Sequence, residues 1–296
     1  RYPSDRYHSD AIINGIGRIG YMSGGKKALW KEEDFAEIFT ERAKHFIDEN
    51  NNKPFFLYLA FHDIHGPRLP HDKFRGKTDM GPRGDAIVQM DWCVGQVVAH
   101  LEKLKLLDNT LIIFTSDNGP VLNDGYDDLS VALLGNHQPS GPFRGGKYSA
   151  YEAGTRVPTI VHWPEQVGHG TSNALISQID LLPSIAELVD NNIGNENLDG
   201  KNILPTLLGK SDSGREYILE ESLIVSLRKG HWKYIPATKV TADDWLLQKG
   251  IEGGFKNSPQ LYDLNNDVSE KNNLTLEYPE LVSEFERILE KEFKKK

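Results

Sequence analysis

Residues able to bind a metal and an anion stand in the middle of the chain. Asp117 and Asn118 follow the apolar run 111–114 and precede Gly119. A carboxylate beside an amide oxygen suits a hard divalent cation such as calcium or magnesium. Lys147 follows two glycines, which allow the backbone to come close to a ligand. A cation next to a fixed ammonium would form a receptor for an oxyanion, although Asp-Asn-Gly taken alone is most often an ordinary turn.

Two apolar runs predict the strands that would position these residues. Residues 111–114 end in the Asp-Asn-Gly turn, and residues 55–61 end in a polar segment with His62 and His65. Short apolar runs bounded by turn residues are typical of buried strands in an α/β sheet. An amphipathic helix over 83–107 joins the runs, which predicts a right-handed βαβ unit with parallel strands. Both strands would then end at one sheet edge, which brings the histidines to the side of the Asp-Asn pair.

The remaining pattern predicts two parts of different style. Further helices are expected at 33–49, 181–189 and 279–293, and strands at 157–163, 216–220, 224–228, 231–235 and 260–264. The expected fold class is therefore α/β. Residues 1–208 would form the larger catalytic α/β domain, and residues 209–296 a small antiparallel sheet with a helix.

Composition restricts the classes of function. The chain has 296 residues, of which 38% are hydrophobic and 26% charged, as in a globular protein with a sizeable core. It has no apolar run of about eighteen residues, so no membrane span is expected. The formal net charge of −9 argues against a nucleic-acid partner. The single cysteine, Cys93, excludes an internal disulfide, and its apolar helical surroundings predict a core thiol.

Several ordered motifs resemble the sulfatase family of the alkaline-phosphatase-like superfamily, in its bacterial polysaccharide-degrading arylsulfatase type. They lie at 55–67, Asp91, 115–119, 145–158, 179–183, 227–235 and 261–270. The resemblance implies an alkaline-phosphatase-like sheet flanked by helices, incomplete at its N-terminus. It also implies a sulfuric ester hydrolase that acts on a sulfated carbohydrate or an aryl sulfate. A periplasmic or secreted location is implied as well, with a signal peptide outside this chain.

The family's functional roles transfer to residues that match its motifs. By the resemblance, Asp117 and Asn118 would bind calcium. Lys147 would bind a sulfate oxygen and steady the leaving oxygen. His65 aligns with the histidine that contacts the sulfate ester and can protonate the departing alcohol. These roles agree with the chemistry, because a metal and an ammonium neutralise charge on the transferring group and an imidazole titrates near neutral pH.

Other residues are candidate substrate contacts. His62 could be a site residue or a packed histidine, and the sequence favours neither alternative. Arg68 and His137 lie in loops at the same predicted sheet edge, where solvated side chains are the commoner case. Arg144 and Arg156 could face the anion or pair with acids, and the structural role is favoured for Arg156.

Two features of the family have no match in the chain. Sulfatases carry a Cys/Ser-x-Pro/Ala-x-Arg motif that matures to the nucleophile formylglycine, and adjacent aspartates that complete the calcium site. In the family's sequences, both features lie in the N-terminal part, before the first position that matches this chain at Arg1. Residues 140–144 fit Ser-x-Pro-x-Arg literally but in the wrong order, so coincidence is the better interpretation. The chain is therefore expected to be the C-terminal portion of a sulfatase, with the missing N-terminal segment as its partner. Alone, it should show little turnover and weak calcium binding.

Two alternative functions stay open. A phosphodiesterase or phosphonate hydrolase of the same superfamily would hold two transition metals with more His and Asp ligands. Its activity on phosphate diesters would not need calcium. A non-catalytic fragment that binds sulfated glycans would keep Lys147 and His65 without a nucleophile. It would bind sulfated sugar without turnover.

Overall fold

The structure, a computed structural model, describes residues 32–66, 68–125, 128–191, 198–241, 246–247 and 249–294. The chain forms two compact units, Arg1–Asp108 with Leu122–His137, and Asn109–Val121 with Gln138–Lys296. The boundary expected after residue 208 stays a prediction. Within the described ranges, no helix is both long enough and apolar enough to cross a membrane.

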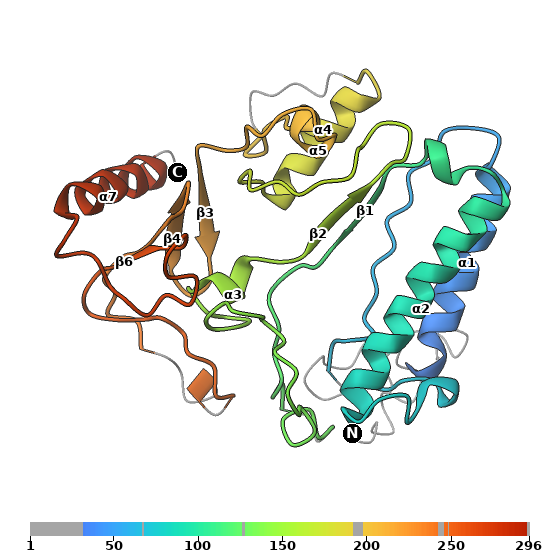
Figure 1. The fold of residues 1–296 in the computed structure, drawn as a ribbon, viewed down its shortest axis with the longest axis horizontal. Coiled ribbons are helices and arrows are strands. Elements are labelled where there is room, and N and C mark those ends of the chain that lie inside the picture. The colour runs from blue at the N-terminus through green and yellow to red at the C-terminus, as the bar shows by residue number, and fades with distance from the viewer. Residues whose placement is uncertain are drawn as a thin grey trace, which may run out of the picture. The chain divides into compact units, whose positions relative to one another are not determined.

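The first unit is built on two long helices. α1 (Phe35–Asn50) and α2 (Gly81–Lys103) lie side by side (Figure 1). The unit also has the 3-10 turns η2 (Glu32–Asp34) and η3 (Asp72–Phe74), and η4 (Leu107–Asn109) spans its end. The buried side chains of the two long helices include Ala36, Ala43, Ile47, Ala86, Cys93 and Leu101. Both predicted helices and the predicted core thiol are thus confirmed. α2 ends earlier than predicted, where Lys105 adopts a φ of 57° and turns the chain.

The predicted parallel βαβ unit is wrong. No strand forms at 55–61, where Phe56 and Tyr58 are 69% and 82% exposed. β1 (Ile112–Thr115) pairs instead with β2 (Thr159–His162), and the pair is antiparallel. A strand needs a neighbour for its backbone hydrogen bonds. Among the described residues no strand pairs with 55–61, whereas the chain after β1 turns back and lays β2 beside it.

In the second unit, short helices precede and follow β2 along the chain. They are α3 (Glu152–Thr155), η5 (Gln178–Asp180), α4 (Leu181–Leu188) and α5 (Leu204–Leu207). The buried carboxylate of Asp180 accepts hydrogen bonds from Ser177 N and Lys201 N and pairs with Arg215. Asp180 therefore anchors the turn before the helix and makes no side-chain cap to α4 itself.

The C-terminal part of the second unit is an antiparallel sheet in the order β3–β4–β5–β6. Its strands are β3 (Tyr217–Glu221), β4 (Val225–Lys229), β5 (Trp232–Ile235) and β6 (Gln260–Asp263), and α7 (Pro279–Phe293) packs against it (Figure 1). The contact between sheet and helix is a cluster of Leu227, Tyr234, Leu261, Phe285 and Leu289. The predicted small sheet with a terminal helix is confirmed.

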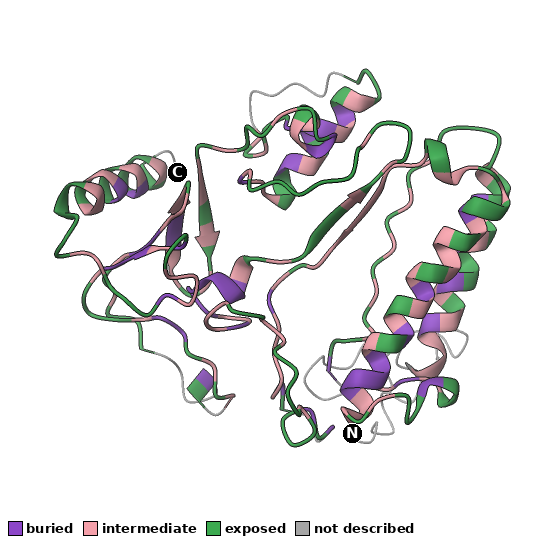
Figure 2. Ribbon diagram, viewed as in Figure 1, coloured by how far each residue is buried: buried purple, intermediate pink, exposed green. Residues whose placement is uncertain are grey.

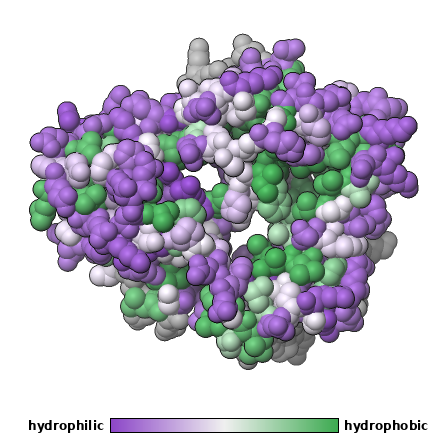
Figure 3. Space-filling model, viewed as in Figure 1, coloured by the Kyte–Doolittle hydropathy of each residue, from purple (hydrophilic) through white to green (hydrophobic). Residues whose placement is uncertain are grey.

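The other face of this sheet carries residues 144–154, named here the Lys147 loop. Ala150 and Tyr151 of the loop cluster with Ile235, Tyr262 and Leu264. Because successive strand residues point to opposite faces, Tyr234 faces α7 whereas Ile235 faces the loop. Figure 2 shows buried residues on α3 and on strands of this sheet, and Figure 3 shows a largely hydrophilic surface over α7. The sheet therefore lies between α7 and the Lys147 loop.

Candidate active site

The Asp-Asn-Gly turn directly follows β1, as the sequence predicts. Asp117 is exposed, and among the described residues its carboxylate receives only a long hydrogen bond from Ser116 Oγ, at 3.5 Å. Asn118 is half-buried, and its Nδ2 donates to Gly119 O at 2.9 Å. The amide nitrogen is therefore engaged while the amide oxygen stays available. The end of β1 thus offers a carboxylate and an amide oxygen to a ligand.

This turn and the Lys147 loop are held in direct backbone contact. Lys147 N–H donates to Pro120 O at 2.8 Å, and Gly119 N–H donates to Gly154 O at 3.0 Å. A Cβ at Gly146 would lie 2.7 Å from Pro120 O, closer than side chains allow. The glycines before Lys147 were expected to admit a ligand. Gly146 admits the backbone that follows the Asp-Asn-Gly turn, whereas Gly145 lies against the side chain of Ser149.

The backbone is strained directly after Lys147. Tyr148 has a φ of 76°, which is rare for an aromatic residue, and such conformations cost about 1–3 kcal/mol where the surroundings hold them. Lys147 Nζ lies 5.5 Å from the centroid of the Tyr148 ring, and no carboxylate of the described residues pairs with it. Strain of this kind is concentrated at functional sites. A half-buried ammonium without an acidic partner can receive an anion.

Asp117 and Asn118 offer the kind of oxygen ligands that a hard cation prefers, but too few of them to complete its coordination. Calcium takes about 6–8 oxygen ligands at about 2.3–2.6 Å. This pair supplies one carboxylate and one amide oxygen. In the part of the chain that the structure describes, no group of three or more His, Cys, Asp or Glu side chains could hold a metal ion. Further ligands would have to come from water, substrate or residues outside that part.

His65 lies in the first unit, in the polar segment after residues 55–61. Its side chain is exposed, and its Nδ1 lies 2.7 Å from Gly66 O. A neutral ring that donates from Nδ1 to a carbonyl keeps Nε2 for a second partner. The ring is thus suited to proton transfer at Nε2. Because His65 and Lys147 belong to different units, their predicted convergence stays a prediction.

His62 packs against two aromatic rings of α1. Its ring lies edge-on to Phe35 and Phe39, with centroids 4.6 and 5.1 Å away. Burial lowers the pKa of His62 because it penalises the charged imidazolium, although neighbouring Asp63 opposes the shift. The residue as a whole is still exposed, so both alternatives left open by the sequence, a packed histidine and a contact with substrate, stay predictions.

Gln89 of α2 fixes the segment that carries both histidines. Its Nε2 donates to Asp63 Oδ1 at 2.6 Å, and its Oε1 accepts from His71 N–H at 2.8 Å. This buried residue was missed in the sequence. It lies one helical turn from Ala86 and from Cys93, so the helical period places a polar side chain on the buried stripe. That departure from the apolar pattern was the signal that could have identified it.

Arg68 is buried and its guanidinium is bound internally. Only 4% of the residue is exposed, and its Nη1 lies 2.6 Å from Asp128 Oδ2 and 2.8 Å from Ser130 Oγ. Its Nε donates to Ile64 O at 3.0 Å, which ties the His65 segment to the loop of residues 122–137. Arg68 is thus not a solvated loop residue, and its predicted contact with substrate stays a prediction.

Arg144 pairs with an acid, one of the two alternatives weighed for it. Its Nε donates to Glu252 Oε2 at 2.8 Å, its Nη1 donates to Glu270 O, and its guanidinium lies 4.1 Å from the centroid of the Tyr151 ring. The hydrogen bond to Glu252 raises the pKa of Arg144. His137 is exposed in the first unit. A contact of either residue with substrate stays a prediction.

Arg156 has the structural role that was favoured for it. Its Nη1 lies 3.2 Å from Oε2 of the buried Glu152. Glu152 also contacts Lys233 and Arg228, so Arg156 is one member of a larger buried charge cluster.

Comparison with known proteins places the chain in a family. The family model described as Sulfatase matches residues 4–191. The chain is 49% identical over 286 residues to N-acetylgalactosamine-6-O-sulfatase of Bacteroides thetaiotaomicron. The matched residues make up 96% of this chain and 56% of that protein. It is 32% identical over 238 residues to arylsulfatase A of Homo sapiens, covering 76% of this chain and 45% of that protein. The chain spans about half the length of the curated relatives it matches.

Solved structures show the same architecture. One, from work on glycosaminoglycan metabolism by Bacteroides thetaiotaomicron, matches with a TM-score of 0.88 and 48% identity, covering 94% of this chain and 58% of that chain. i-CgsB in complex with k-i-k-neocarrahexaose matches with a TM-score of 0.69 and 26% identity, covering 92% and 56%. The predicted alkaline-phosphatase-like α/β fold class is confirmed by these likenesses. The protein is a member of the sulfatase family.

Proposed function

We propose that this protein is a sulfuric ester hydrolase acting on sulfated carbohydrate, and that its described residues bind the sulfate group and a metal. The observation that carries the proposal is the backbone contact between the Lys147 loop and the Asp-Asn-Gly turn. It keeps the backbone of Lys147, whose ammonium has no acidic partner among the described residues, next to the turn that carries a carboxylate and an amide oxygen. In a chain of the sulfatase family, that combination is a receptor for a tetrahedral anion.

Each candidate residue has a distinct chemical task. The Lys147 ammonium donates hydrogen bonds to a sulfate oxygen and to the ester oxygen, where negative charge develops as the sulfur–oxygen bond breaks. Nε2 of protonated His65 gives its proton to that oxygen, so the product leaves as a neutral alcohol. Asp117 and Asn118 would hold calcium, which supplies positive charge to the sulfate group when bound. The nucleophile, formylglycine in this family, is expected outside the described residues.

The proposed substrate class is a glycan that carries sulfate on N-acetylgalactosamine. The relative from Bacteroides thetaiotaomicron is an N-acetylgalactosamine-6-O-sulfatase, and it matches 96% of this chain. Aryl sulfates are the simpler substrates of the same reaction, as in the human relative arylsulfatase A. Sulfated glycans of this kind occur outside the cytoplasm. A periplasmic or secreted location therefore goes with the proposal.

The test separates binding from turnover. N-acetylgalactosamine 6-sulfate and unsulfated N-acetylgalactosamine are titrated into the chain by calorimetry, with calcium and with a chelator. Sulfate release from the sulfated sugar and from 4-nitrophenyl sulfate is followed in parallel. The proposal expects binding of the sulfated sugar only, weakened about tenfold or more by Lys147→Met because a charge-assisted contact is lost. Lys229→Met, a lysine on the α7 side of the sheet, is the matched control.

The outcomes distinguish the proposed activity from the alternatives. Sulfate release by the chain would show a complete catalytic site, and binding without release is the result expected if the nucleophile lies elsewhere in the protein. Equal affinity for the sulfated and unsulfated sugars would overturn the proposal. Hydrolysis of a phosphate diester that persists in the chelator would favour the phosphodiesterase alternative.

A further inference from the structure

The Lys147 loop is bonded to the C-terminal sheet subdomain along its length. Ser149 Oγ donates to Glu252 O at 2.7 Å, and Ala150 N–H donates to Gly253 O at 2.8 Å. On the other side, Ser222 Oγ donates to the carbonyl of Tyr148 at 2.8 Å, next to Lys147. These bonds join residues far apart in sequence. The conformation of the loop therefore depends on the C-terminal subdomain.

A buried charge cluster lies beneath the loop. Glu152, at the start of α3, is fully buried, and its carboxylate lies 3.6 Å from Lys233 Nζ of β5 and 2.7 Å from Arg228 Nη1 of β4. Lys233 is also fully buried and pairs with Glu220 of β3. Lys233 and Arg228 stand opposite each other across the β4–β5 pair. Two neighbouring strands thus present cations to one carboxylate of the loop.

Glu270 contacts the Lys147 loop near both of its ends. Its Oε2 accepts a hydrogen bond from Glu152 N–H at 2.8 Å, and its backbone oxygen accepts one from Arg144. The residue is fully buried and has a φ of 52°, a strained conformation for glutamate. Its Oε1 has no hydrogen-bond partner among the described residues. Buried polar atoms without a hydrogen-bond partner are uncommon in folded proteins, so this strained acid calls for a specific role.

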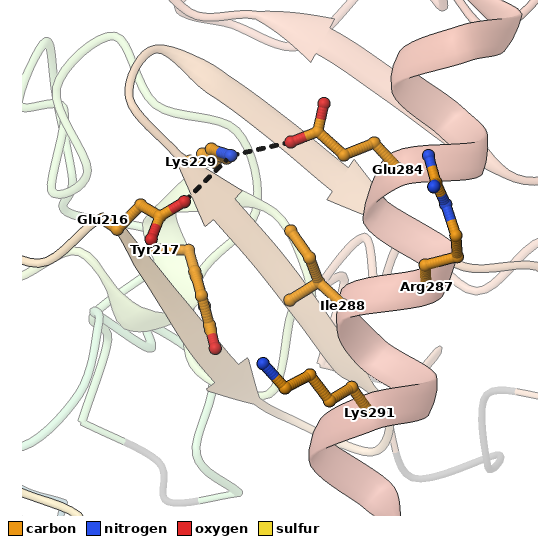
Figure 4. A pocket seen from close by; sticks show the side chains of 7 residues that line it. All are labelled: Glu216, Tyr217, Lys229, Glu284, Arg287, Ile288 and Lys291. Atoms are coloured by element: carbon orange, nitrogen blue, oxygen red, sulfur yellow. Dashed lines mark hydrogen bonds and ion pairs between the residues drawn. The ribbon is translucent and has the colours of Figure 1, made fainter.

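The cluster is specific to one face of the sheet. Lys233 faces the loop, whereas Lys229 of β4 faces α7 and lies between Glu216 at 3.1 Å and Glu284 at 2.7 Å (Figure 4). Lys229 makes no contact with the Lys147 loop among the interactions of the described residues. The two ion-paired lysines on adjacent strands therefore hold different elements, and they also differ in burial, because Lys233 is fully buried whereas the Lys229 side chain is 30% exposed.

We propose that Glu152, Lys233 and Glu270 are positioning residues that set the Lys147 ammonium against the Asp-Asn-Gly turn, so that the C-terminal sheet controls the affinity of the site for a sulfate ester. The chain of contacts is continuous. The cluster holds α3 and the loop, Gly154 O receives Gly119 N–H, and Pro120 O receives Lys147 N–H. This inference rests on the proposed function for its binding readout but not for its structural readout.

The test compares Lys233→Met with Lys229→Met in the full chain. Each variant removes one ion-paired lysine from the same sheet. Hydrogen exchange by mass spectrometry is measured for peptides covering residues 116–121 and 144–154, which contain the amides of Gly119 and Lys147. The dissociation constant for 4-nitrophenyl sulfate and the melting temperature are measured alongside. Lys233→Met should speed exchange in both peptides by about tenfold or more and weaken binding by a similar factor, whereas Lys229→Met should change neither.

The readouts separate positioning from general stability and from the proposed function. Equal exchange in the two variants at matched loss of melting temperature would overturn the positioning role, because a merely structural cluster lowers stability without loosening these two amides selectively. If wild type and Lys147→Met bind the sulfate ester equally, the proposed function fails while the exchange result still decides the inference.

A milder variant tests the same dependence if Lys233→Met does not fold. Ser222→Ala deletes the hydrogen bond to the Tyr148 carbonyl, together with the local one that Ser222 Oγ accepts from Leu223 N–H, and should speed exchange of residues 144–154. Thr238→Ala, whose hydroxyl bonds locally to Val240 N, is its control. Unchanged exchange in Ser222→Ala would contradict the dependence of the loop on the sheet.

Discussion

The Lys147 loop and the His65 segment each carry a predicted catalytic side chain, but they are held by different forces. The Lys147 loop is fixed by ionised side chains on a sheet face, Glu152 with Lys233 and Arg228, and by close backbone approach at glycines. The His65 segment is fixed mainly by a neutral amide, Gln89, and by one buried ion pair at its end. The first arrangement depends on charges from three strands, whereas the second depends on two helices and one loop.

This difference shows how reactive side chains can stay available while their backbone is rigid. Asp117 and His65 are exposed, and Lys147 is half-buried with no acidic partner among the described residues. The residues that hold them, such as Gln89, Glu152 and Lys233, are buried and bound to other side chains or to the backbone. Preorganisation of this kind would keep the proposed site ready without using the candidate catalytic groups themselves as structural contacts.

The largest expected effect is at the ion pair of the His65 region. Asp128→Asn leaves the buried Arg68 guanidinium without its carboxylate, which should lower the free energy of unfolding by about 3–5 kcal/mol in urea denaturation. Asp72→Asn is the control, because its pair with Arg75 is exposed and should be worth about 1 kcal/mol or less. Similar losses in the two variants would mean that Arg68 does not anchor this segment.

A smaller effect is expected at Gln89. Gln89→Leu keeps the size of the side chain but leaves Asp63 and His71 N–H without their partner, at a cost of about 1–3 kcal/mol. Hydrogen exchange over residues 62–71 should rise, while exchange over residues 144–154 should stay unchanged. Loosening of both regions together would contradict their separate anchoring.

The two regions should also differ in their response to pH. Burial raises the pKa of Glu270 to about 8, with Lys233 opposing the shift. The folded protein then binds this proton more tightly than the unfolded chain, so stability falls as pH rises from 4.5 towards 8 and levels off above. The slope should be on the order of 1 kcal/mol per pH unit. Urea unfolding at several pH values measures it, and Glu270→Gln should flatten it.

Glu252 is the matched acid with the opposite shift. The hydrogen bond from Arg144 lowers the pKa of Glu252, so its contribution is present above the unfolded pKa and is lost as pH falls through the folded one. Glu252→Gln should therefore reduce stability near neutral pH and leave the Glu270 slope in place. A wild-type slope that survives Glu270→Gln would show that another group carries it.

The smallest expected effect concerns His62. Burial against Phe35 and Phe39 lowers its pKa below 6.5, so protonation favours unfolding and its contribution is lost as pH falls below that value. Histidine resonances followed by NMR during a pH titration should show His62 changing at lower pH than a free imidazole. Phe39→Leu should move that midpoint upwards. A midpoint at or above 6.5 in the wild type would contradict the packing.

The C-terminal subdomain could be predicted closely, but the pairing of the front strands could not. The helix expected at 279–293 has those bounds, because its apolar stripe and the proline at its start are local signals. The strand expected at 55–61 failed because an apolar run does not say which neighbour will pair with it. The antiparallel partner of β1 comes from beyond the long loop of residues 116–158, which no local pattern reveals.

The sequence offers the candidate residues of the site, whose roles stay predictions, but it does not reveal the residues that support them. Asp117, Asn118 and Lys147 were identified by residue type and by the glycines around them. Lys233 and Glu270 were not, because charged residues are usually solvated. Lys233 alternates with Trp232 and Tyr234 in a strand, which places it on the same face as Ile235. A lysine on the same strand face as the buried Ile235 was the available signal.

A crystal structure of the chain soaked with calcium and 4-nitrophenyl sulfate tests the central claim most directly. The account predicts a calcium ion about 2.3–2.6 Å from oxygens of Asp117 and Asn118. It also predicts a sulfate oxygen within hydrogen-bond distance of Lys147 Nζ. A sulfate ester bound elsewhere, with the Lys147 ammonium turned into solvent and no density beside Asp117, would contradict the claim that the Lys147 loop and the Asp-Asn-Gly turn form one site.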